Sequence, residues 1–227
     1  MPQHRKLVKH FHEPGDLHAF TFSCYRRLPL LTNDVWRASL AEHLTTALAT
    51  QRFQLVAFVF MPEHVHLLTL PLDPQPAISE FLRQIKQPYS SEIHERLRST
   101  QAPLLARLTI RDRPGKQVFR YWQEGPGFDR NLNTPQAVQA EIDYLHNNPV
   151  ARKLCRRAID WKWSSARHYL LQNASRDPEL TPLSMLPAHF WDGSEAVRLT
   201  AELLRLWILG RRAAFRRAWR SWRPCCG

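Results

Sequence analysis

Residues 53–70 constrain the fold most strongly, because they join two apolar runs through a very short break. The run "FQLVAFVF" (53–60) has the length and composition of a buried strand. "MPE" then turns the chain, and "HVHLLTL" (64–70) returns as the next strand. The rest of the fold must therefore be built around this pair of consecutive strands.

Two amphipathic segments on either side of the pair are predicted to be helices. Residues 33–51 open with Asn33 as a helix cap, and residues 77–98 have a helical pattern that Pro88 should kink or split. The first of these segments carries apolar residues on roughly one face, namely Val35, Leu40, Leu44 and Leu48.

One further strand is expected at each end of this region. Residues 17–25, "LHAFTFSCY", alternate and are rich in aromatics, and residues 113–122 supply a turn and another short strand. The resulting order is β-α-β-β-α-β. It predicts an α+β, ferredoxin-like fold, in which an antiparallel sheet carries its helices on one face.

A third helix follows this unit. Thr134 caps it, Pro135 occupies its first position, and the pattern runs to Asn148, where Pro149 is expected to end it. The composition changes after about residue 172. We therefore expect a first domain over residues 1–172, followed by a turn-rich linker and a basic, Arg/Trp-rich helical extension over residues 173–227.

The charge of the chain indicates a nucleic-acid partner. The net charge is +12, and with 32 Lys and Arg residues of which six are Lys, 32 − 6 leaves 26 arginines. Arginine favours bidentate phosphate contacts and stacking on bases. A GC-rich genome would also raise the arginine content, but it would not explain the excess of base over acid.

Basic and aromatic residues that alternate along the chain are candidates for single-stranded DNA contacts. In the first domain they are Arg83, Lys86, Tyr89, Arg111, Arg113, Lys116 and Arg120, with Trp122 beside the last of them. In the extension they are Arg216, Arg217, Trp219 and Arg220. A helix lying on a membrane surface is the rival interpretation of the extension.

Several other classes of protein lack their signatures. No stretch approaches the roughly 18 apolar residues of a membrane helix, and no secretory signal is visible, so the expected location is the cytoplasm. The four cysteines form no C-x-x-C pair, which argues against a zinc ribbon or a disulfide framework. With only seven glycines, the chain has no Walker-type phosphate loop.

His64 and His66 form the first chemically distinctive motif. Residues i and i+2 of a strand face the same side, so the two imidazoles can supply half of a divalent-metal site. By the same parity Glu63 should face away from His64. The residues after the pair are Leu67, Leu68, Thr69 and Leu70, which do not continue the H-x-H-x-D-H motif of metallo-hydrolases. Two plain structural histidines remain an alternative.

Tyr144 and Asn148, on the third predicted helix, form the second motif. They are four residues apart and therefore lie on one face of the helix. A tyrosine hydroxyl can attack a phosphodiester, and an amide oxygen can complete a metal site with His64 and His66. The alternatives are a packed aromatic for Tyr144 and a helix cap for Asn148.

The two motifs together resemble a known family. "FMPEHVHLL" followed by "IDYLHNNPV" is similar to the single-tyrosine HUH transposases, in particular the REP-associated tyrosine transposases. The stretches "LRQIKQPYS" (82–90), "YWQEGPGFDRNL" (121–132) and "WKWSSARHY" (161–169) are also similar. The resemblance covers residues 15 to 170.

The resemblance implies an activity and roles for specific residues. It implies cleavage of single-stranded DNA near a hairpin through a covalent 5′-phosphotyrosine, with Mg²⁺ or Mn²⁺ as cofactor. Tyr144 matches the nucleophile, His64 and His66 match the metal-binding pair, and Asn148 matches a third ligand. The family also implies a homodimer as one arrangement, with DNA rather than a membrane as the partner.

Two alternatives remain open beside this transposase hypothesis. One is a catalytically silent protein that binds hairpin DNA on the same fold. The other is an unrelated metallo-hydrolase that uses the histidine pair. The second predicts metal-dependent turnover that survives the substitution Tyr144→Phe.

Overall fold

The computed structural model describes residues 12–125, 127–171, 177–186 and 188–191. Within these ranges, none of the helices combines the length and the apolar character needed to cross a membrane. The four extension residues expected to contact DNA, Arg216, Arg217, Trp219 and Arg220, lie outside the described residues.

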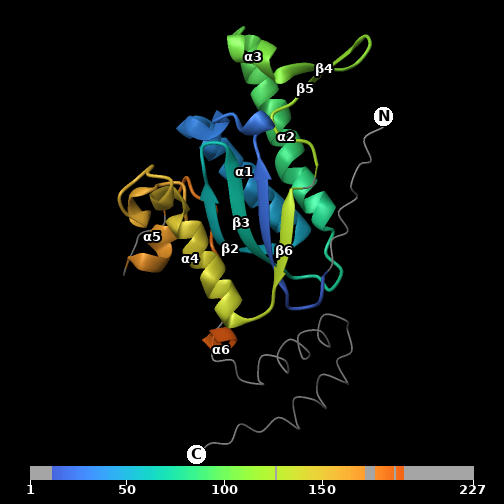
Figure 1. Cartoon of the computed structure of the whole chain (residues 1–227). Helices are drawn as coiled ribbons and strands as arrows, with labels where there is room; N and C mark the ends of the chain where they lie inside the picture. The colour runs from blue at the N-terminus through green and yellow to red at the C-terminus, as the bar shows by residue number, and fades with distance from the viewer. Residues whose placement is uncertain (1–11, 126, 172–176, 187, 192–227) are drawn as a thin grey trace, which may run out of the picture.

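A four-stranded antiparallel sheet forms the centre of the fold (Figure 1). Its strands are β1 (Leu17–Ser23), β2 (Phe53–Phe60), β3 (His64–Pro71) and β6 (Phe128–Leu132). They are arranged in the order β2-β3-β1-β6, and every neighbouring pair is antiparallel. This is the strand order of a ferredoxin-like sheet, so the predicted α+β class is confirmed.

The fourth strand is not the one expected from the sequence. Residues 109–119 instead form a separate hairpin of β4 (Thr109–Arg113) and β5 (Lys116–Phe119). These strands have no buried face to place in the sheet, because their side chains are exposed or only half-buried. The sheet position is taken by β6, whose last residue, Leu132, is buried.

Helix α1 (Asp34–Gln51) begins where the sequence indicates. The Asn33 side chain accepts hydrogen bonds from the amides of Val35 and Trp36, at 2.9 and 3.3 Å. Leu40, Leu44 and Leu48 are buried as expected, but Val35 is 60% exposed. Five residues separate Val35 from Leu40, and at 100° per residue this places Val35 about 140° around the helix.

Helix α2 (Ile78–Ser99) runs through Pro88 as one continuous helix, so the expected split does not occur. Pro88 is exposed, whereas Ile85 and Tyr89, on either side of it, are fully buried. Both halves of the helix are therefore held on the same apolar face of the sheet.

The remaining helices of the described residues are short. They are η1 (Tyr25–Arg27), η2 (Leu30–Thr32), α3 (Pro103–Leu108), η3 (Ala158–Asp160), α5 (Ala166–Leu170) and α6 (Ala188–Trp191).

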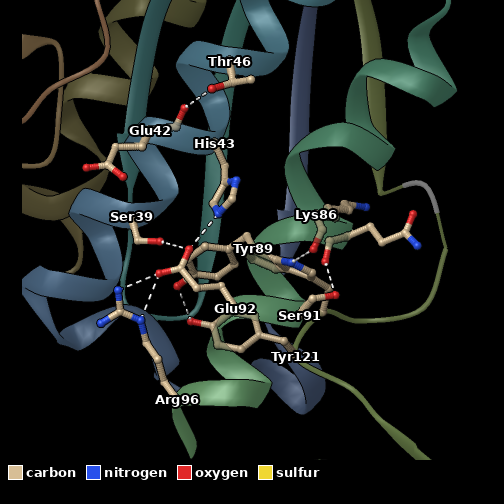
Figure 2. Close-up of polar contacts among 12 residues, drawn as sticks. Ser39, Glu42, His43, Thr46, Lys86, Tyr89, Ser91, Glu92, Arg96 and Tyr121 are labelled. Carbon is tan, nitrogen blue, oxygen red and sulfur yellow. Dashed lines mark hydrogen bonds and ion pairs between the residues drawn. The ribbon is translucent and has the colours of Figure 1, made fainter.

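A cluster of polar side chains joins α1 to α2 (Figure 2). The Glu92 carboxylate accepts hydrogen bonds from Ser39 Oγ at 2.7 Å and from Arg96 Nη2 at 2.7 Å, and His43 Nε2 lies 2.8 Å from it. Partial burial by itself would raise the pKa of Glu92, but the hydrogen bonds from Ser39, His43 and Arg96 outweigh it and lower this pKa. The cluster therefore favours the ionised carboxylate.

We expect Glu92→Gln to lower the free energy of unfolding by about 1 kcal/mol at pH 7. Because the pKa of Glu92 is lower in the folded than in the unfolded state, its contribution is complete above the unfolded pKa and is lost as the pH falls through the folded pKa. Urea unfolding at pH 7 and at pH 3 measures the difference. The control is Glu95→Gln, which removes an exposed partner of Arg98 on the same helix; an equal loss in both variants would contradict the prediction.

Helices α1 and α2 share one face of the sheet as expected, and the third predicted helix, α4 (Pro135–Ala151), packs against the other face (Figure 1). Its buried residues Val138, Ile142 and Leu145 join an apolar cluster with side chains from β2 and β3. Thr134 caps the helix as predicted, accepting from the amide of Ala137 at 3.3 Å. Pro149 does not end it, because a proline in the last turn removes only one helical hydrogen bond.

Residues 177–186, part of the predicted linker, form no helix or strand and contact the sheet and α1. Thr181 Oγ1 donates to the carbonyl of Ala41 at 3.0 Å, and the amide of Ser184 donates to the carbonyl of Leu55 at 2.8 Å. Leu186 is buried in the same cluster as α4. The domain boundary near residue 172 stays a prediction.

Candidate active site

The two histidines lie on the sheet face that α4 covers. On β3, His64 and His66 pair with Ser23 and Thr21 of β1, and Val65 between them points into the opposite core. The Nε2 atoms of His64 and His66 are 2.9 Å apart, with the rings nearly perpendicular at 86°. The expectation that both imidazoles face one side of the sheet is confirmed.

Helix α4 brings the other two predicted residues to the same place. Asn148 is buried, and its Nδ2 lies 3.4 Å from His66 Nε2. The Tyr144 ring stands edge-to-face to the His66 ring, with their centroids 5.5 Å apart, and Tyr144 is 54% exposed. The tyrosine is thus next to the histidines and open to a ligand, whereas a packed core aromatic would be buried.

Burial keeps both imidazoles neutral. Burial, together with a smaller effect of the neighbouring His64, lowers the pKa of His66 to about 3. Burial also lowers the pKa of His64, although the Glu63 carboxylate opposes this shift and the Arg152 and Arg27 guanidinium groups add to it. A neutral imidazole is the form that binds a metal ion.

Each imidazole is held through its second nitrogen. His64 Nδ1 donates to Glu63 Oε1 at 3.1 Å, and His66 Nδ1 shares a hydrogen bond of 2.7 Å with Thr21 Oγ1. A proton on Nδ1 leaves the Nε2 lone pair free, so the contact with Glu63 selects the tautomer of His64 that can bind a metal.

The placement of Glu63 corrects the expectation that it faces away from His64. Glu63 precedes β3 and lies in the turn, where the alternation of strand side chains does not apply. Its carboxylate is buried and also forms an ion pair with Arg152, the residue that caps the end of α4. One carboxylate therefore connects a candidate metal ligand to the helix that carries Tyr144 and Asn148.

The donor set fits a divalent cation. Two neutral imidazole nitrogens converge with a side-chain amide, and half a turn of that amide exchanges its nitrogen for an oxygen that can bind a metal. Across the described part of the chain, no three His, Cys, Asp or Glu side chains are grouped for metal binding. The Asn148 amide, which lies beside His66, stays the predicted third ligand.

His146 of α4 is near this site but does not take part in it. It is buried, and its Nε2 lies 2.8 Å from Ser165 Oγ on the far side of the helix. Burial lowers its pKa to about 4. Its contact with Ser165 and its packing on Tyr169 indicate a structural role.

The basic residues expected to bind DNA in the first domain lie on α2 and around the β4–β5 hairpin, not on β3 or α4. Four of them line a cleft of about 590 Å³ between α2 and the β4–β5 hairpin: Arg83, Lys86, Lys116 and Arg120. Arg120 is paired with Asp112 and Glu124, and Arg83 with Glu80. Arg111 and Arg113 are exposed on β4. Acidic neighbours thus offset part of the positive charge of this cleft.

Tyr89 is the exception, and its expected DNA contact is wrong. It is fully buried, and its hydroxyl lies 3.1 Å from that of Tyr121 (Figure 2). Trp122 is also buried and donates from Nε1 to the carbonyl of Lys86 at 3.1 Å. Neither ring is available for a base to stack on.

Two arginines near the site were not predicted from the sequence. Arg27 follows β1, is exposed, and has a left-handed backbone with φ of 53°. Arg152 lies at the end of α4. Their positive charges both act on His64, which places them beside the candidate metal site. The sequence carries no pattern that distinguishes these two arginines from the others.

Part of the chain is similar to a known family, and the whole fold is similar to a solved structure. Residues 16–107 match the family model described as "Transposase IS200 like". This segment contains the histidine pair and ends before α4. The match supports the resemblance to single-tyrosine transposases over this segment, which is less than half of the chain.

Two solved structures are similar to the chain. A REP-associated tyrosine transposase bound to a REP hairpin has 18% identity and a TM-score of 0.55, over 82% of this chain and 96% of that one. That likeness shows a shared fold. A crystal structure assigned to the transposases, from Deinococcus radiodurans, has 20% identity and a TM-score of 0.38, over 65% of this chain and 97% of that one. The second score is too low to indicate a shared fold. No curated protein matches the chain.

Proposed function

We propose that the chain is a metal-dependent endonuclease and strand transferase that acts on single-stranded DNA at hairpin-forming repeats. The observation that carries this proposal is the convergence of four side chains at one point between β3 and α4. An exposed tyrosine stands beside two imidazole nitrogens 2.9 Å apart and a buried amide. The transposase family match supports the same reaction class.

The proposed reaction is an attack by Tyr144 on a phosphodiester. The tyrosine oxygen forms a bond to phosphorus, its proton is released, and the bond from phosphorus to the 3′-oxygen breaks to leave a free 3′-hydroxyl. The product is a 5′-phosphotyrosine, which conserves the energy of the broken linkage and allows rejoining without a nucleotide cofactor. His64, His66 and Asn148 would hold Mg²⁺ or Mn²⁺, which polarises the phosphate when bound.

The surrounding residues suit this chemistry. Thr21 and Glu63 fix the imidazole orientations from behind, and neutral histidines need not lose a proton before binding a cation. Arg27 and Arg152 add positive charge beside His64, where the phosphate of a bound strand would lie. This part of the mechanism requires no movement of the sheet.

A DNA hairpin is the proposed partner. The solved relative of the same fold is bound to a REP hairpin, and this chain carries a net charge of +12. The basic cleft between α2 and the β4–β5 hairpin would bind the duplex stem while a single strand lies at Tyr144. A catalytically silent hairpin-binding protein is the second candidate, because binding needs only the charge and the fold.

The test uses end-labelled hairpin oligonucleotides with single-stranded flanks, taken from repeats beside the gene. They are incubated with the protein and Mn²⁺, and a denaturing gel detects a covalent protein–DNA band. We expect a band with Mn²⁺, none with EDTA, and none when the flank is made double-stranded. Tight hairpin binding without any adduct would favour the silent protein.

A further inference from the structure

We propose that Phe128 is a stacking platform for a nucleobase next to the phosphate that Tyr144 attacks. The proposal rests on the proposed function and adds a binding subsite to it. Phe128 is the first residue of β6, the edge strand of the sheet (Figure 1), and is 59% exposed. A large apolar ring this exposed calls for a ligand or a partner.

Strand register places His66, Thr21 and Phe128 in one row across the sheet. Thr21 of β1 pairs with His66 on one side and with Phe128 on the other. Directly opposed residues in antiparallel strands point to the same face of a sheet. The hydrogen bond between Thr21 and His66 marks that face as the one with the histidines. Neighbouring strands are about 4.8 Å apart, so Phe128 lies roughly 10 Å from His66 across the sheet.

The next residues of β6 confirm which way Phe128 points. Arg130 forms an ion pair with Glu141 of α4, and Leu132 is buried in the apolar cluster below that helix. Side chains alternate along a strand, so Phe128, Arg130 and Leu132 share the face that α4 covers. Leu132 is buried by the helix, whereas Phe128, at the other end of β6, is left open.

The exposure pattern sets Phe128 apart from the other aromatics. Among the residues that the structure describes, only two Phe, Tyr or Trp side chains are exposed, and they are Phe128 and Tyr144. Both lie on the same face of the sheet around His66. Exposed aromatics scattered by chance would not gather at one site, and aromatic rings along a single strand of DNA are its usual stacking platforms.

Gly127 lets the backbone just before Phe128 lie close to β1. Its φ is +89°, and a Cβ at this position would lie 2.3 Å from the carbonyl oxygen of Thr21. The backbone before Phe128 is therefore pressed against the residue that orients His66, and only glycine fits there. Phe128 is thus held at a fixed offset from the candidate metal ligands.

The positive charges around this row favour a nucleic acid over an apolar partner as the ligand of Phe128. Arg27 and Arg152 lie beside His64, and Arg130 follows Phe128 with its side chain half exposed. A strand whose phosphates lie along these cations would present its bases to the sheet face between them. We therefore commit to a base of single-stranded DNA as the occupant, rather than to a second copy of this chain.

The test measures binding to a labelled single-stranded oligonucleotide in EDTA, by fluorescence anisotropy, so that cleavage does not interfere. We expect Phe128→Ala to weaken binding about 10-fold, Phe128→Leu to weaken it nearly as much, and Phe128→Trp to retain it. Leu170→Ala is the control, because Leu170 is also 59% exposed but lies on α5, outside the row. An abasic-site scan of the oligonucleotide locates the stacked base.

Stacking predicts that one abasic position weakens binding to the wild type and has no further effect on Phe128→Ala. If wild type and Phe128→Ala bind every oligonucleotide equally while the wild type still forms its covalent adduct, the stacking platform is wrong and the proposed function stands. If the wild type neither binds single strands nor forms an adduct, both are wrong. A variant that only shifts a monomer–dimer equilibrium in sedimentation would assign the ring to a second copy and overturn the proposal.

Discussion

Replacing Tyr144 with phenylalanine is expected to abolish the covalent protein–DNA adduct, a loss of more than about 10³-fold, while hairpin binding is unchanged. The substitution removes only the hydroxyl, which forms no intramolecular hydrogen bond among the contacts of the described residues, and the ring is already 54% exposed. The fold and the metal ligands should therefore be unaffected. The same gel assay with Mn²⁺, together with anisotropy in EDTA, measures both quantities.

A second tyrosine provides the matched control for this prediction. Tyr25 is half-buried and begins η1, outside the set of candidate ligands, and Tyr25→Phe should leave the adduct intact. Metal-dependent cleavage that persists in Tyr144→Phe, without an adduct, would indicate a metal-activated water as the nucleophile. That outcome would support the metallo-hydrolase alternative and exclude a phosphotyrosine mechanism.

Replacing Glu63 with glutamine is expected to weaken Mn²⁺ binding by 10- to 100-fold, roughly the effect of losing the partner of a ligating histidine. Glutamine keeps the size of the side chain but loses the charge that holds the Nδ1 proton of His64 and pairs with Arg152. His64 is then free to place its proton on Nε2, where a metal would bind. Isothermal titration of the metal-free protein with Mn²⁺ measures the affinity directly.

Glu63 also joins β3 to α4, so a general loosening of the helix must be separated from an effect on the imidazole. Glu141→Gln is the control, because Glu141 joins α4 to the sheet through Arg130 at a distance from the histidines. We expect both variants to lose some thermal stability and only Glu63→Gln to lose metal affinity. An unchanged Mn²⁺ affinity in Glu63→Gln would limit Glu63 to attaching the helix.

The sequence predicts the parts of the site that depend on regular periodicity. His64 and His66 share a face because they are two apart on a strand, and Tyr144 and Asn148 share one because they are four apart on a helix. Neither rule says that these two faces meet. That contact depends on α4 packing on the sheet face opposite α1 and α2, which is a tertiary arrangement that local patterns do not contain.

The wrong predictions arise where the periodicity of a segment is weak, or where strand alternation is applied to residues outside a strand. Strand β6 was missed because "FDRNL" has only two apolar residues, which suffices at a sheet edge but gives no strong pattern. Glu63 was misplaced by applying strand parity to a turn. Tyr89 could have been predicted correctly, because it lies four residues after Ile85 and four before Ile93, on the apolar stripe of α2.

The placement of α4 also determines when, during synthesis and folding, the candidate site becomes complete. Half of the candidate site lies on the sheet and half on a helix that is synthesised much later, so a nascent chain that has formed only its β2–β3 hairpin holds two histidines and no nucleophile. Fraying of α4 would likewise separate Tyr144 from the imidazoles without unfolding the sheet. Under the proposed mechanism, strand cutting would be restricted to molecules that have completed folding.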